Sequence, residues 1–518
     1  MEKKYYEFTN EISRDELYAG LLGHGLFSTS LPPLFTSLDF YEFCNKVNPS
    51  FNKKESNDYV SFLAMRNINI PRPISIPTPM KYQLLCEELK KNWDTIQTFF
   101  YNVTQSQSYK ISRIHIRKRF DKEGECYFGS LFEMNYHNWS DEDSVEDNLL
   151  LSSFNNTYYA SKYVVKADIS SCFPSIYTHS LPWALVGKEE AKRQRKKDRW
   201  FNEIDKACRK TKNGETHGLL IGPHCYNLLA EIVLTSIDKT IYDSGFKFFR
   251  NIDDYTCYVI SYEQAQTFLN TLEKCLASFG LLLNHKKTTI DELPAARTDH
   301  WKRQLQTVEL VTQDGYTTYS QVNSFMDLAV KLTDVNNDAA ILNYAIKVLS
   351  GLKDYLSGNA RASVIKRVLH LALLYPYLVK LLDDYLFSAL KVETDDIINF
   401  SEALYNASLL SNHFEGLAYS LMFAIKYNFT LDVFSIDSII DTDDCIVYLC
   451  ALLYAKKYEM SEDIDRLESM AETINKNGDF DKYWLFCYEA LSEDSMNDDW
   501  RLLKKNDISF ICDEFRSY

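Results

Sequence analysis

Apolar and polar positions along the chain predict alternating strands and helices in its first part. Residues 163–168, YVVKAD, are an apolar run that ends on an aspartate. Residues 246–260, FKFFRNIDDYTCYVI, predict two short strands around a tight turn. The spacing over residues 223–241 predicts a helix with Pro223 in its first turn, and residues 81–101 predict an amphipathic helix.

Two upstream segments predict extended structure. Residues 70–80, IPRPISIPTPM, hold four prolines, which exclude a helix interior and favour an extended segment along the surface. Residues 111–120, ISRIHIRKRF, alternate basic and apolar positions. This alternation predicts a strand with one basic face, which carries Arg113, Arg117 and Arg119.

The pattern changes after about residue 320. Apolar clusters then recur at helical spacing with little β-branched alternation, over 324–350, 361–374, 376–392, 397–410, 413–429, 446–458 and 481–492. We therefore expect an α+β part over residues 1–320 and an all-α part over 321–518, built as a bundle or stack of paired helices. The residues alone show no fixed period that would identify a repeat.

Charge follows the same division. The 518-residue chain has a net charge of -15. Residues 1–320 contain 39 Lys and Arg against 40 Asp and Glu, whereas residues 321–518 contain 18 against 32. The first part can therefore hold a local basic channel despite the acidic total. Its most basic window, residues 188–212, is expected to line a path for single-stranded nucleic acid or to be a solvated helix face.

Composition excludes several classes of protein. No run of about 18 uncharged apolar residues is present, so we expect no membrane span. The segment MEKKYYEFTNEISRDE lacks the apolar core of a secretory signal. The twelve cysteines form no CxxC pair and several lie in apolar runs, which is typical of buried thiols in a reducing compartment. We therefore expect a cytoplasmic protein.

Acidic residues supply the candidate chemistry. Asp-Asp pairs occur at 253–254, 383–384, 395–396, 443–444 and 498–499. The last four lie at the edges of helical segments, where helix capping or solvation accounts for them. Asp253–Asp254 alone could be polar turn residues, but Asp168 ends a second apolar strand. If these strands are neighbours, their carboxylates meet at one end of a sheet, as a site with two metals about 3.5–4 Å apart requires.

Four segments in order resemble the motifs of reverse transcriptases. DISSCFPSIY (168–177) resembles motif A, GLLIGPHCYNLLAEIVL (218–234) motif B, NIDD (251–254) the YxDD box of motif C and FGLLLNHKKTTI (279–290) motif D. The blocks at 72–93 and 163–188 are similar to those of bacterial abortive-infection (Abi) reverse transcriptases, the group of AbiK and AbiA. The type found in P2-like prophages is the most similar.

The resemblance implies a fold and an activity. It implies right-hand-like fingers and palm over residues 1–320, with motifs A to D within 163–290, and a HEAT-like helical repeat domain over 321–518 in place of a thumb. It also implies a Mg²⁺-dependent DNA nucleotidyltransferase, with Mn²⁺ as a substitute, that uses deoxynucleoside triphosphates. The group works in the bacterial cytoplasm as homo-oligomers in defence against phage.

Metal binding and proton transfer are assigned by position within the motifs. The resemblance implies that Asp168 and Asp253 are the principal metal ligands, with Asp254 as the third carboxylate and the Ile169 carbonyl as a further oxygen. Lys287 would face the triphosphate and protonate the leaving pyrophosphate. Without the motif, Lys287 would be an ordinary surface lysine.

Nucleotide binding is assigned in the same way. Phe173 would stack under the sugar and exclude a 2′-hydroxyl, where its alternative is a core aromatic residue. Ile221 and Gly222 lie in the nucleotide-binding turn of motif B. The basic face that holds Arg113, Arg117 and Arg119 would bind phosphates or be a solvated strand face.

Two departures from the motifs bear on the template. Ile221 stands where motif B usually has Gln, and Asn251 replaces the tyrosine of YxDD. Since a hydrogen-bonding contact is lost, template copying is in doubt while the metal chemistry is retained. The resembled group makes DNA without a template, starting from a protein tyrosine. Among the 35 tyrosines, Tyr5 and Tyr6 are eligible with several others, and the sequence selects none.

Three functions are therefore open from the sequence. The first is template-independent, protein-primed DNA synthesis in phage defence, with a single-stranded product attached to a tyrosine. The second is a templated reverse transcriptase that uses an RNA template. The third is a catalytically silent scaffold that binds nucleic acid and a partner. The three aspartates at 168, 253 and 254 argue against a scaffold, which has no need of converging carboxylates.

Overall fold

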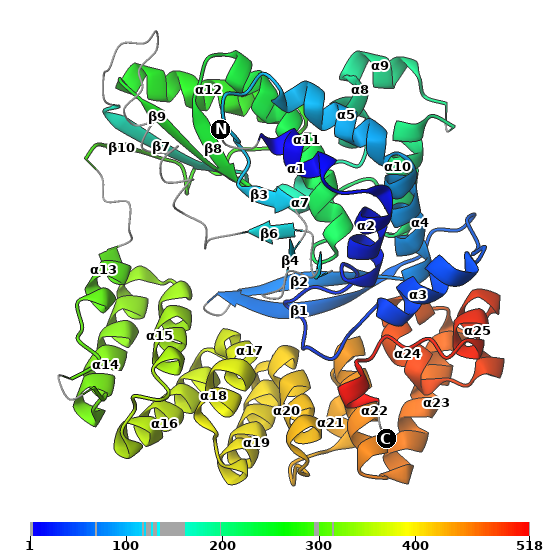
Figure 1. The fold of residues 1–518 in the computed structure, drawn as a ribbon. Coiled ribbons are helices and arrows are strands. Elements are labelled where there is room, and N and C mark those ends of the chain that lie inside the picture. Colours follow the sequence, from blue (N-terminus) through cyan, green and yellow to red (C-terminus); the bar gives the residue numbers. More distant parts are fainter. Residues whose placement is uncertain are drawn as a thin grey trace.

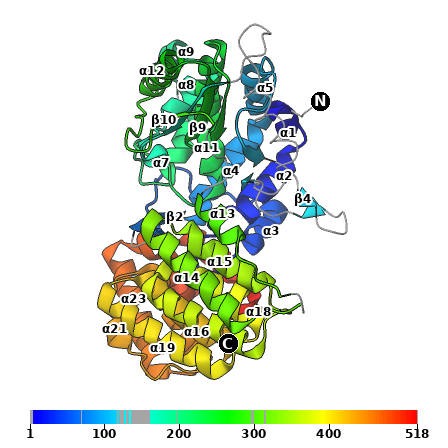
Figure 2. The ribbon, with the colours of Figure 1, turned by 90° about the vertical axis from the view of Figure 1, so that its left-hand side faces the viewer.

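The computed structural model describes residues 4–67, 70–116, 119–120, 126–127, 132–134, 161–196, 198–294, 300–312 and 315–516. Figure 1 shows two layers, in which a body of strands and helices lies above a curved row of helices. The upper body comes from the first part of the chain and the lower row from the last part. Figure 2 shows the same layers from the side.

A four-stranded antiparallel sheet is the centre of the upper body. It consists of β7 (Tyr163–Asp168), β8 (Phe248–Asn251), β9 (Asp254–Val259) and β10 (Thr289–Glu292), in the order β10-β7-β9-β8. The apolar runs at 163–168 and 246–260 therefore form strands, as their pattern predicts: β7 and β9 are central and β8 lies at an edge. Helix α12 (Tyr262–Ser278) packs on β7 and β9, and α11 (His224–Asp243) packs on α12.

Three smaller strand pairs also belong to the first part of the chain. Strands β1 (Tyr59–Asn67) and β2 (Ile70–Pro77) form an antiparallel hairpin, β3 (Ile114–Ile116) pairs with β6 (Phe132–Met134), and β4 (Arg119–Phe120) pairs with β5 (Cys126–Tyr127). The proline-rich segment is extended as predicted, but residues 74–77 are buried rather than on the surface. Its prolines are tolerated because a two-stranded hairpin leaves one edge without ladder bonds. The single strand expected over 111–120 is divided into β3 and β4.

Several helices surround these strands. They are α1 (Tyr5–Asn10), α2 (Arg14–Tyr18), the π-helix η1 (Ala19–Gly23), α3 (Leu38–Val47), α4 (Pro79–Lys91), α5 (Trp93–Thr104), α7 (Cys172–Ser175), α8 (Ser180–Val186), α9 (Lys188–Arg193) and α10 (Trp200–Lys210). The helix predicted over 81–101 is two helices, because the chain leaves helical geometry at Asn92, with φ −102° and ψ 12°.

Helices make up the lower layer. They are α13 (His300–Gln306), α14 (Tyr319–Asn336), α15 (Ala340–Gly351), α16 (Gly358–Leu374), η3 (Pro376–Leu378), α17 (Val379–Leu382), η4 (Asp383–Phe387), α18 (Ser388–Leu390), α19 (Thr394–Ser411), α20 (Phe414–Tyr427), α21 (Ile436–Ile440), α22 (Cys445–Lys457), α23 (Ser461–Asn477), η5 (Phe480–Tyr483), α24 (Trp484–Ala490), η6 (Glu493–Ser495), α25 (Asp498–Lys505) and η7 (Asp513–Phe515). Helix α13 packs on α14 and α15, so helical contacts begin before residue 320.

The last helices are docked on the beginning of the chain. The Trp484 indole donates a hydrogen bond to the Ile76 carbonyl over 3.2 Å. The Thr36 amide donates to the Phe510 carbonyl over 2.9 Å, and Arg516 forms an ion pair with Asp39. Buried backbone and indole groups are thus satisfied across the two layers, which joins them into one packed body.

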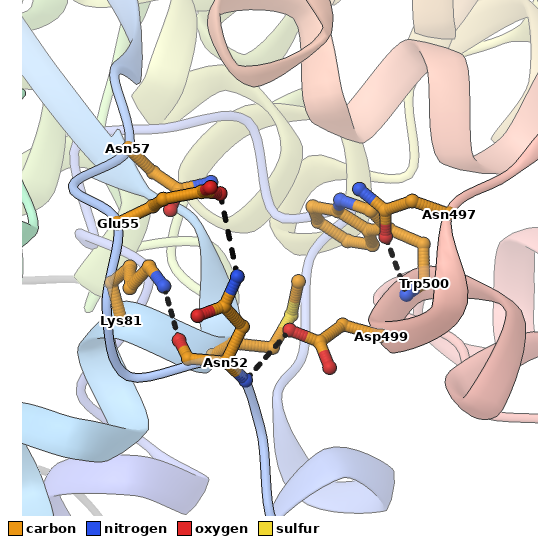
Figure 3. A pocket seen from close by; sticks show the side chains of 8 residues that line it. Asn52, Glu55, Asn57, Lys81, Asn497, Asp499 and Trp500 are labelled. Atoms are coloured by element: carbon orange, nitrogen blue, oxygen red, sulfur yellow. Dashed lines mark hydrogen bonds between the residues drawn. The ribbon is translucent and has the colours of Figure 1, made fainter.

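A small polar pocket lies at this junction (Figure 3). It is lined by Asn52, Glu55, Asn57, Met80, Lys81, Asn497, Asp499 and Trp500. The Asn52 amide donates to the Asp499 carboxylate over 3.0 Å, and the buried Lys81 ammonium donates to the Asn52 carbonyl. These bonds tie the loop before β1 and the start of α4 to α25.

A buried carboxyl lies at a second contact between the layers. Glu415, in α20, accepts a hydrogen bond of 2.6 Å from the Met65 amide in β1. Burial raises the pKa of Glu415 to about 7. A carboxyl whose pKa is raised in the folded protein causes no loss of stability below the pKa of the unfolded chain, near 4.3. The loss grows as the pH rises toward 7 and is complete above it.

Glu415→Gln is therefore expected to become more stable than the wild type as the pH rises. The free energy of unfolding of Glu415→Gln minus that of the wild type should be up to about 3 kcal/mol larger at pH 8 than at pH 5. Urea unfolding at the two pH values measures this difference. His413 Nε2 lies 3.9 Å from the Glu415 carboxylate, so any change in the titration of His413 is part of the measured difference. An equal difference at pH 5 and pH 8 would contradict the assignment.

Candidate active site

Three aspartates lie together at one end of the central sheet. In the ladder between β7 and β9, Asp168 is the partner of Asp254. Directly opposite residues of an antiparallel pair point to the same face of a sheet. The Ile169 amide also donates to the Asp253 carbonyl over 3.1 Å. The strand ends thus bring motifs A and C together, although 84 residues of chain separate Asp168 from Asp253.

The turn between β8 and β9 has an uncommon backbone. Asn251 and Asp254 are ladder partners, so only Ile252 and Asp253 make the turn. Ile252 has φ +53°, in the left-handed region that β-branched residues rarely adopt. The Arg250 guanidinium donates to the Ile252 carbonyl over 2.8 Å. Asp253 therefore lies in a tight turn that a hydrogen bond from Arg250 stabilises.

Burial and neighbouring carboxylates raise the pKa values of Asp253 and Asp254. Partial desolvation raises the pKa of Asp254 to about 6, and repulsion from Asp253 and Asp168 adds to the rise. Burial is also the main cause that raises the pKa of Asp253, with repulsion from Asp168 added. Lys287 and Arg66 oppose the rise at both positions, because a nearby cation favours the charged carboxylate.

Lys287 is paired with a carboxylate. Its ammonium donates to the Asp168 carboxylate over 2.6 Å, whereas the sequence predicts that it faces a triphosphate. Asp168 is almost fully buried, but the Lys287 side chain is 60% exposed. An uncompensated carboxylate beside two others attracts the nearest cation. Since the lysine side chain is mostly in solvent, it can leave Asp168 without disturbing the core.

The carboxylates do not form a closed ligand cluster. Within the ranges that the structure describes, no three His, Cys, Asp or Glu side chains lie close enough to surround one metal ion. The donors nevertheless suit Mg²⁺, which takes carboxylate and carbonyl oxygens. The repulsion that helps to raise the pKa of Asp254 is the interaction that a divalent cation between these carboxylates would relieve.

Motif A and motif B residues meet beside the aspartates. Phe173 lies in α7 and is half-buried against the core, and its carbonyl accepts a hydrogen bond of 2.8 Å from the Leu219 amide. The Ile221 carbonyl accepts a bond of 2.8 Å from the Ser75 amide of β2. The turn before α11 is therefore fixed to both α7 and β2.

Gly222 allows this close contact. Its φ is +130°, and an added Cβ would lie 3.1 Å from the Ile74 Cγ2 and 3.2 Å from the Ser75 carbonyl oxygen. A side chain would push the turn away from β2. Glycine at this position is thus needed both for the backbone angle and for the approach of the two segments.

Comparison with known proteins identifies this region. Residues 72–307 match the family model of reverse transcriptase (RNA-dependent DNA polymerase). The chain contains a reverse-transcriptase domain. The match covers less than half of the chain and includes all three aspartates. The domain indicates a polymerase-type nucleotidyltransferase, and domains of this kind generally use divalent metals. Comparison with curated proteins gives no significant match.

Solved structures of telomerases show a distant similarity. Apo telomerase from Candida tropicalis truncated from the C-terminal domain is 12% identical over 50% of this chain and 55% of its own, with a TM-score of 0.30. Telomerase from Candida albicans in complex with the TWJ fragment of telomeric RNA is 13% identical over 80% and 66%, with a TM-score of 0.31. This chain thus spans 55% of the first and about two thirds of the second.

The predicted phosphate-binding arginines are only partly placed. Arg113 directs its guanidinium over the Phe249 ring, 3.9 Å from the ring centroid, so its position is set by packing on the reverse-transcriptase domain. Arg117 lies outside the described residues, and Arg119 begins strand β4. Of the three, only the Arg113 side chain is placed by the described residues, and it lies on Phe249.

Two arginines of the fingers hairpin are near the aspartates instead. Arg66 lowers the pKa of both Asp253 and Asp254. Burial and repulsion from Arg66 lower the pKa of Arg72, while Asp253 opposes that shift. Sequence reasoning missed both residues. Their only signal was basic character in a hairpin, since their approach to motif C depends on how the fingers pack on the palm.

The basic window at 188–212 is not uniformly exposed. It contains helices α9 and α10, and Lys210 and Lys212 are buried. The Lys212 ammonium donates to the carbonyls of His217 and Gly218, so it supports the turn that leads into motif B. This lysine is structural.

Among the described helices, none has both the length and the apolar character needed to cross a membrane.

Proposed function

We propose that the chain is a phage-defence DNA polymerase that adds deoxynucleotides to a protein tyrosine without copying a template. The observation that carries the proposal is the placement of Asp168 opposite Asp254 and beside Asp253, within a reverse-transcriptase domain. A buried carboxylate, Asp168, beside two further carboxylates that repel it is costly for stability. Metal-dependent nucleotidyl transfer gives them a function.

The proposed reaction assigns a role to each group. Asp168 and Asp253 would hold Mg²⁺ with the Ile169 carbonyl, and Asp254 would be the third carboxylate. Bound Mg²⁺ lowers the pKa of an attacking hydroxyl and stabilises the in-line displacement of pyrophosphate. Mn²⁺ would serve as a substitute because it takes the same oxygen ligands.

Basic side chains would bind the triphosphate. Lys287 would move from Asp168 to the triphosphate and protonate the leaving pyrophosphate. Arg66 and Arg72 would contact the phosphates from the fingers, since both are electrostatically coupled to Asp253. Arg113, Arg117 and Arg119 would act farther along the nucleic acid.

Phe173→Ala is expected to relax the selection of deoxynucleotides. Phe173 is half-buried, and its carbonyl accepts a hydrogen bond from Leu219, just before the motif B turn at Ile221 and Gly222 where the resemblance places the sugar. Removal of a steric contact of this size should lower discrimination against ribonucleotides by about 10- to 100-fold. The ratio of kcat/KM for dATP and ATP measures it. Phe279→Ala, which removes a half-buried ring elsewhere in the domain, is the control. An unchanged ratio would contradict the assignment.

Template independence is supported by the motif B turn. Ile221 replaces the usual Gln, and its backbone is fixed on β2. A hydrogen-bond donor to the template is therefore lost. The alternative, a templated enzyme that copies RNA, is favoured by the description of the matching family as RNA-dependent DNA polymerase.

The priming tyrosine must reach the aspartates. Tyr5 is buried and its hydroxyl donates to Glu231, so it is not accessible in this conformation. Tyrosines with more than 40% of their surface exposed include Tyr101, Tyr177, Tyr262, Tyr316, Tyr319 and Tyr355. The proposal requires one accessible hydroxyl and does not choose among them.

The remaining parts of the proposal come from the family resemblance. They are that the helical layer is HEAT-like and takes the place of a thumb, that the protein assembles into homo-oligomers, and that it acts in the bacterial cytoplasm during abortive infection. The division at residue 320 belongs with them. The all-helical composition of the described part of 321–518 is consistent with such a domain.

One experiment separates the proposed functions. The purified chain is incubated with labelled deoxynucleotides and Mg²⁺, either alone or with an RNA template and a DNA primer. Incorporation without primer, a random product sequence and a gel shift after protease digestion support protein-primed synthesis. Incorporation only with the primer and template supports the templated alternative. No incorporation in either arm would contradict both.

A further inference from the structure

A fully buried cluster of charged side chains lies next to the turn between β8 and β9. Arg250, in β8, donates through Nε to the Asp238 carboxylate over 2.8 Å and through Nη1 to Glu231 Oε1 over 2.7 Å. All three side chains are at most 1% exposed. Glu231 and Asp238 are seven residues apart in α11, so they lie on the same face of the helix, two turns apart. The guanidinium is thus fixed from two sides.

The same guanidinium fixes the turn. Its Nη1 donates to the Ile252 carbonyl over 2.8 Å. That carbonyl belongs to the peptide between Ile252 and Asp253, and Ile252 has the strained φ of +53°. A bond to this oxygen sets the rotation of the peptide and with it the direction of the Asp253 side chain. Arg250 therefore acts on the aspartate without touching the reactants.

The N-terminal helix is connected to this group. The hydroxyl of Tyr5, in α1, donates to Glu231 Oε2 over 3.0 Å, and the Ser112 hydroxyl donates to the same oxygen over 2.9 Å. Arg250 Nη2 is a third donor to that oxygen, over 3.2 Å. Three donors on one carboxylate oxygen leave Glu231 little freedom to turn. A chain of hydrogen bonds thus leads from α1 to the turn of motif C.

A contribution to stability does not by itself explain why Arg250, Glu231 and Asp238 are buried together. Two carboxylates and one guanidinium are removed from water, and burial raises the pKa of Asp238 to about 6 although Arg250 opposes the rise. Apolar residues of similar volume often stabilise a core at least as well as a buried ion pair. The bond to Ile252 is the contact that apolar residues could not replace.

We propose that Arg250 is a positioning residue that sets the orientation of Asp253 through the Ile252 carbonyl, and that α1 supports it through Tyr5 and Glu231. The proposal rests on the proposed polymerase function. It implies that the N-terminal helix is part of the catalytic apparatus rather than only a surface addition. A displacement of about 1 Å at a reacting group can cost about 10²-fold in rate.

The test compares two variants with matched controls. Arg250→Lys keeps the charge but cannot bind Glu231, Asp238 and Ile252 together, so kcat should fall about 100-fold with the KM for dATP within about twofold of the wild type. Tyr5→Phe removes one hydroxyl and should lower kcat about 3- to 10-fold. Thr9→Val, which removes a hydroxyl bonded to the Tyr6 carbonyl in the same helix, should leave kcat unchanged. Circular dichroism and the unfolding midpoint confirm that each protein is folded.

The outcomes are distinguishable. A lower kcat with a constant KM in a folded Tyr5→Phe protein supports the positioning role. Titration of the active sites separates this result from partial unfolding, which would lower the concentration of active sites. If the wild type polymerises and both variants match its kcat, the positioning role is wrong while the polymerase function stands. If Arg250→Lys does not fold, Tyr5→Phe decides alone. An inactive wild type overturns both proposals.

Discussion

Asp253→Asn is expected to reduce nucleotide incorporation by at least about 10³-fold while the chain stays folded. The substitution keeps the shape of the side chain but removes the charge that would hold Mg²⁺. Asp253 is half-buried in the turn between β8 and β9, and its carboxyl already experiences repulsion from Asp168. Loss of one charge should therefore not destabilise the fold. Incorporation of labelled dATP at saturating Mg²⁺ measures the effect.

A matched control comes from another acidic pair. Asp396→Asn changes an exposed residue in the first turn of α19 and should leave incorporation at the wild-type rate. Asp168→Asn should behave like Asp253→Asn, since the two residues would share the metal. Retention of more than about a tenth of the wild-type rate in a folded Asp253→Asn protein would contradict the metal assignment.

Trp484→Ala should lower the free energy of unfolding by about 3–5 kcal/mol, the usual cost of removing a large buried aromatic side chain. Trp484 is fully buried and stacks on Trp500 at 5.5 Å between ring centroids. It also contacts Phe510 edge-to-face at 5.0 Å and donates to the Ile76 carbonyl. Its loss leaves a cavity at the contact between α24 and the fingers hairpin.

Urea unfolding followed by circular dichroism measures this loss. Trp183→Ala removes a half-buried indole from α8 and should cost much less. Because β2 also holds the motif B turn through Ser75 and Ile221, Trp484→Ala should lower incorporation as well. A loss of less than about 1 kcal/mol would show that the two layers are not coupled at this contact.

The strands that carry the site could be predicted because their sequence signal is local. Residues 163–168 are an apolar run that ends at Asp168, and residues 246–260 are two apolar runs on either side of the turn at Asp253. The structure makes them β7, β8 and β9. The helix predicted over 223–241 is α11, with Pro223 as its N-cap residue. In each case burial follows the periodicity of the sequence.

Most of the remaining acidic pairs lie at the starts of helices, as the sequence predicts. Asp444 accepts hydrogen bonds from the Ile446 and Val447 amides at the start of α22. The pairs at 395–396 and 498–499 lie in the first turns of α19 and α25. Asp383 differs because it lies within η4 and is buried against Lys426 and Tyr427. Its partners come from α20, which no local pattern indicates.

Elements of low hydrophobicity and contacts between distant segments could not be predicted. Helix α23 buries only Leu467 and Ala471, so it gives no apolar cluster in the sequence. Trp484 reaches Ile76 across the two layers, and Tyr5 reaches Glu231 across more than 200 residues. Such contacts depend on the packing of whole elements. The same reason hides the approach of Arg66 to the aspartates.

Manganese binding at the aspartates is the most direct test of the central claim, that Asp168, Asp253 and Asp254 form a two-metal site. Electron paramagnetic resonance with Mn²⁺ and a non-hydrolysable dATP analogue counts the bound ions in the wild type and in Asp168→Asn and Asp253→Asn. The account predicts two ions in the wild type and a loss of at least one in each variant. Equal binding in all three proteins, or no binding in the wild type, would contradict it.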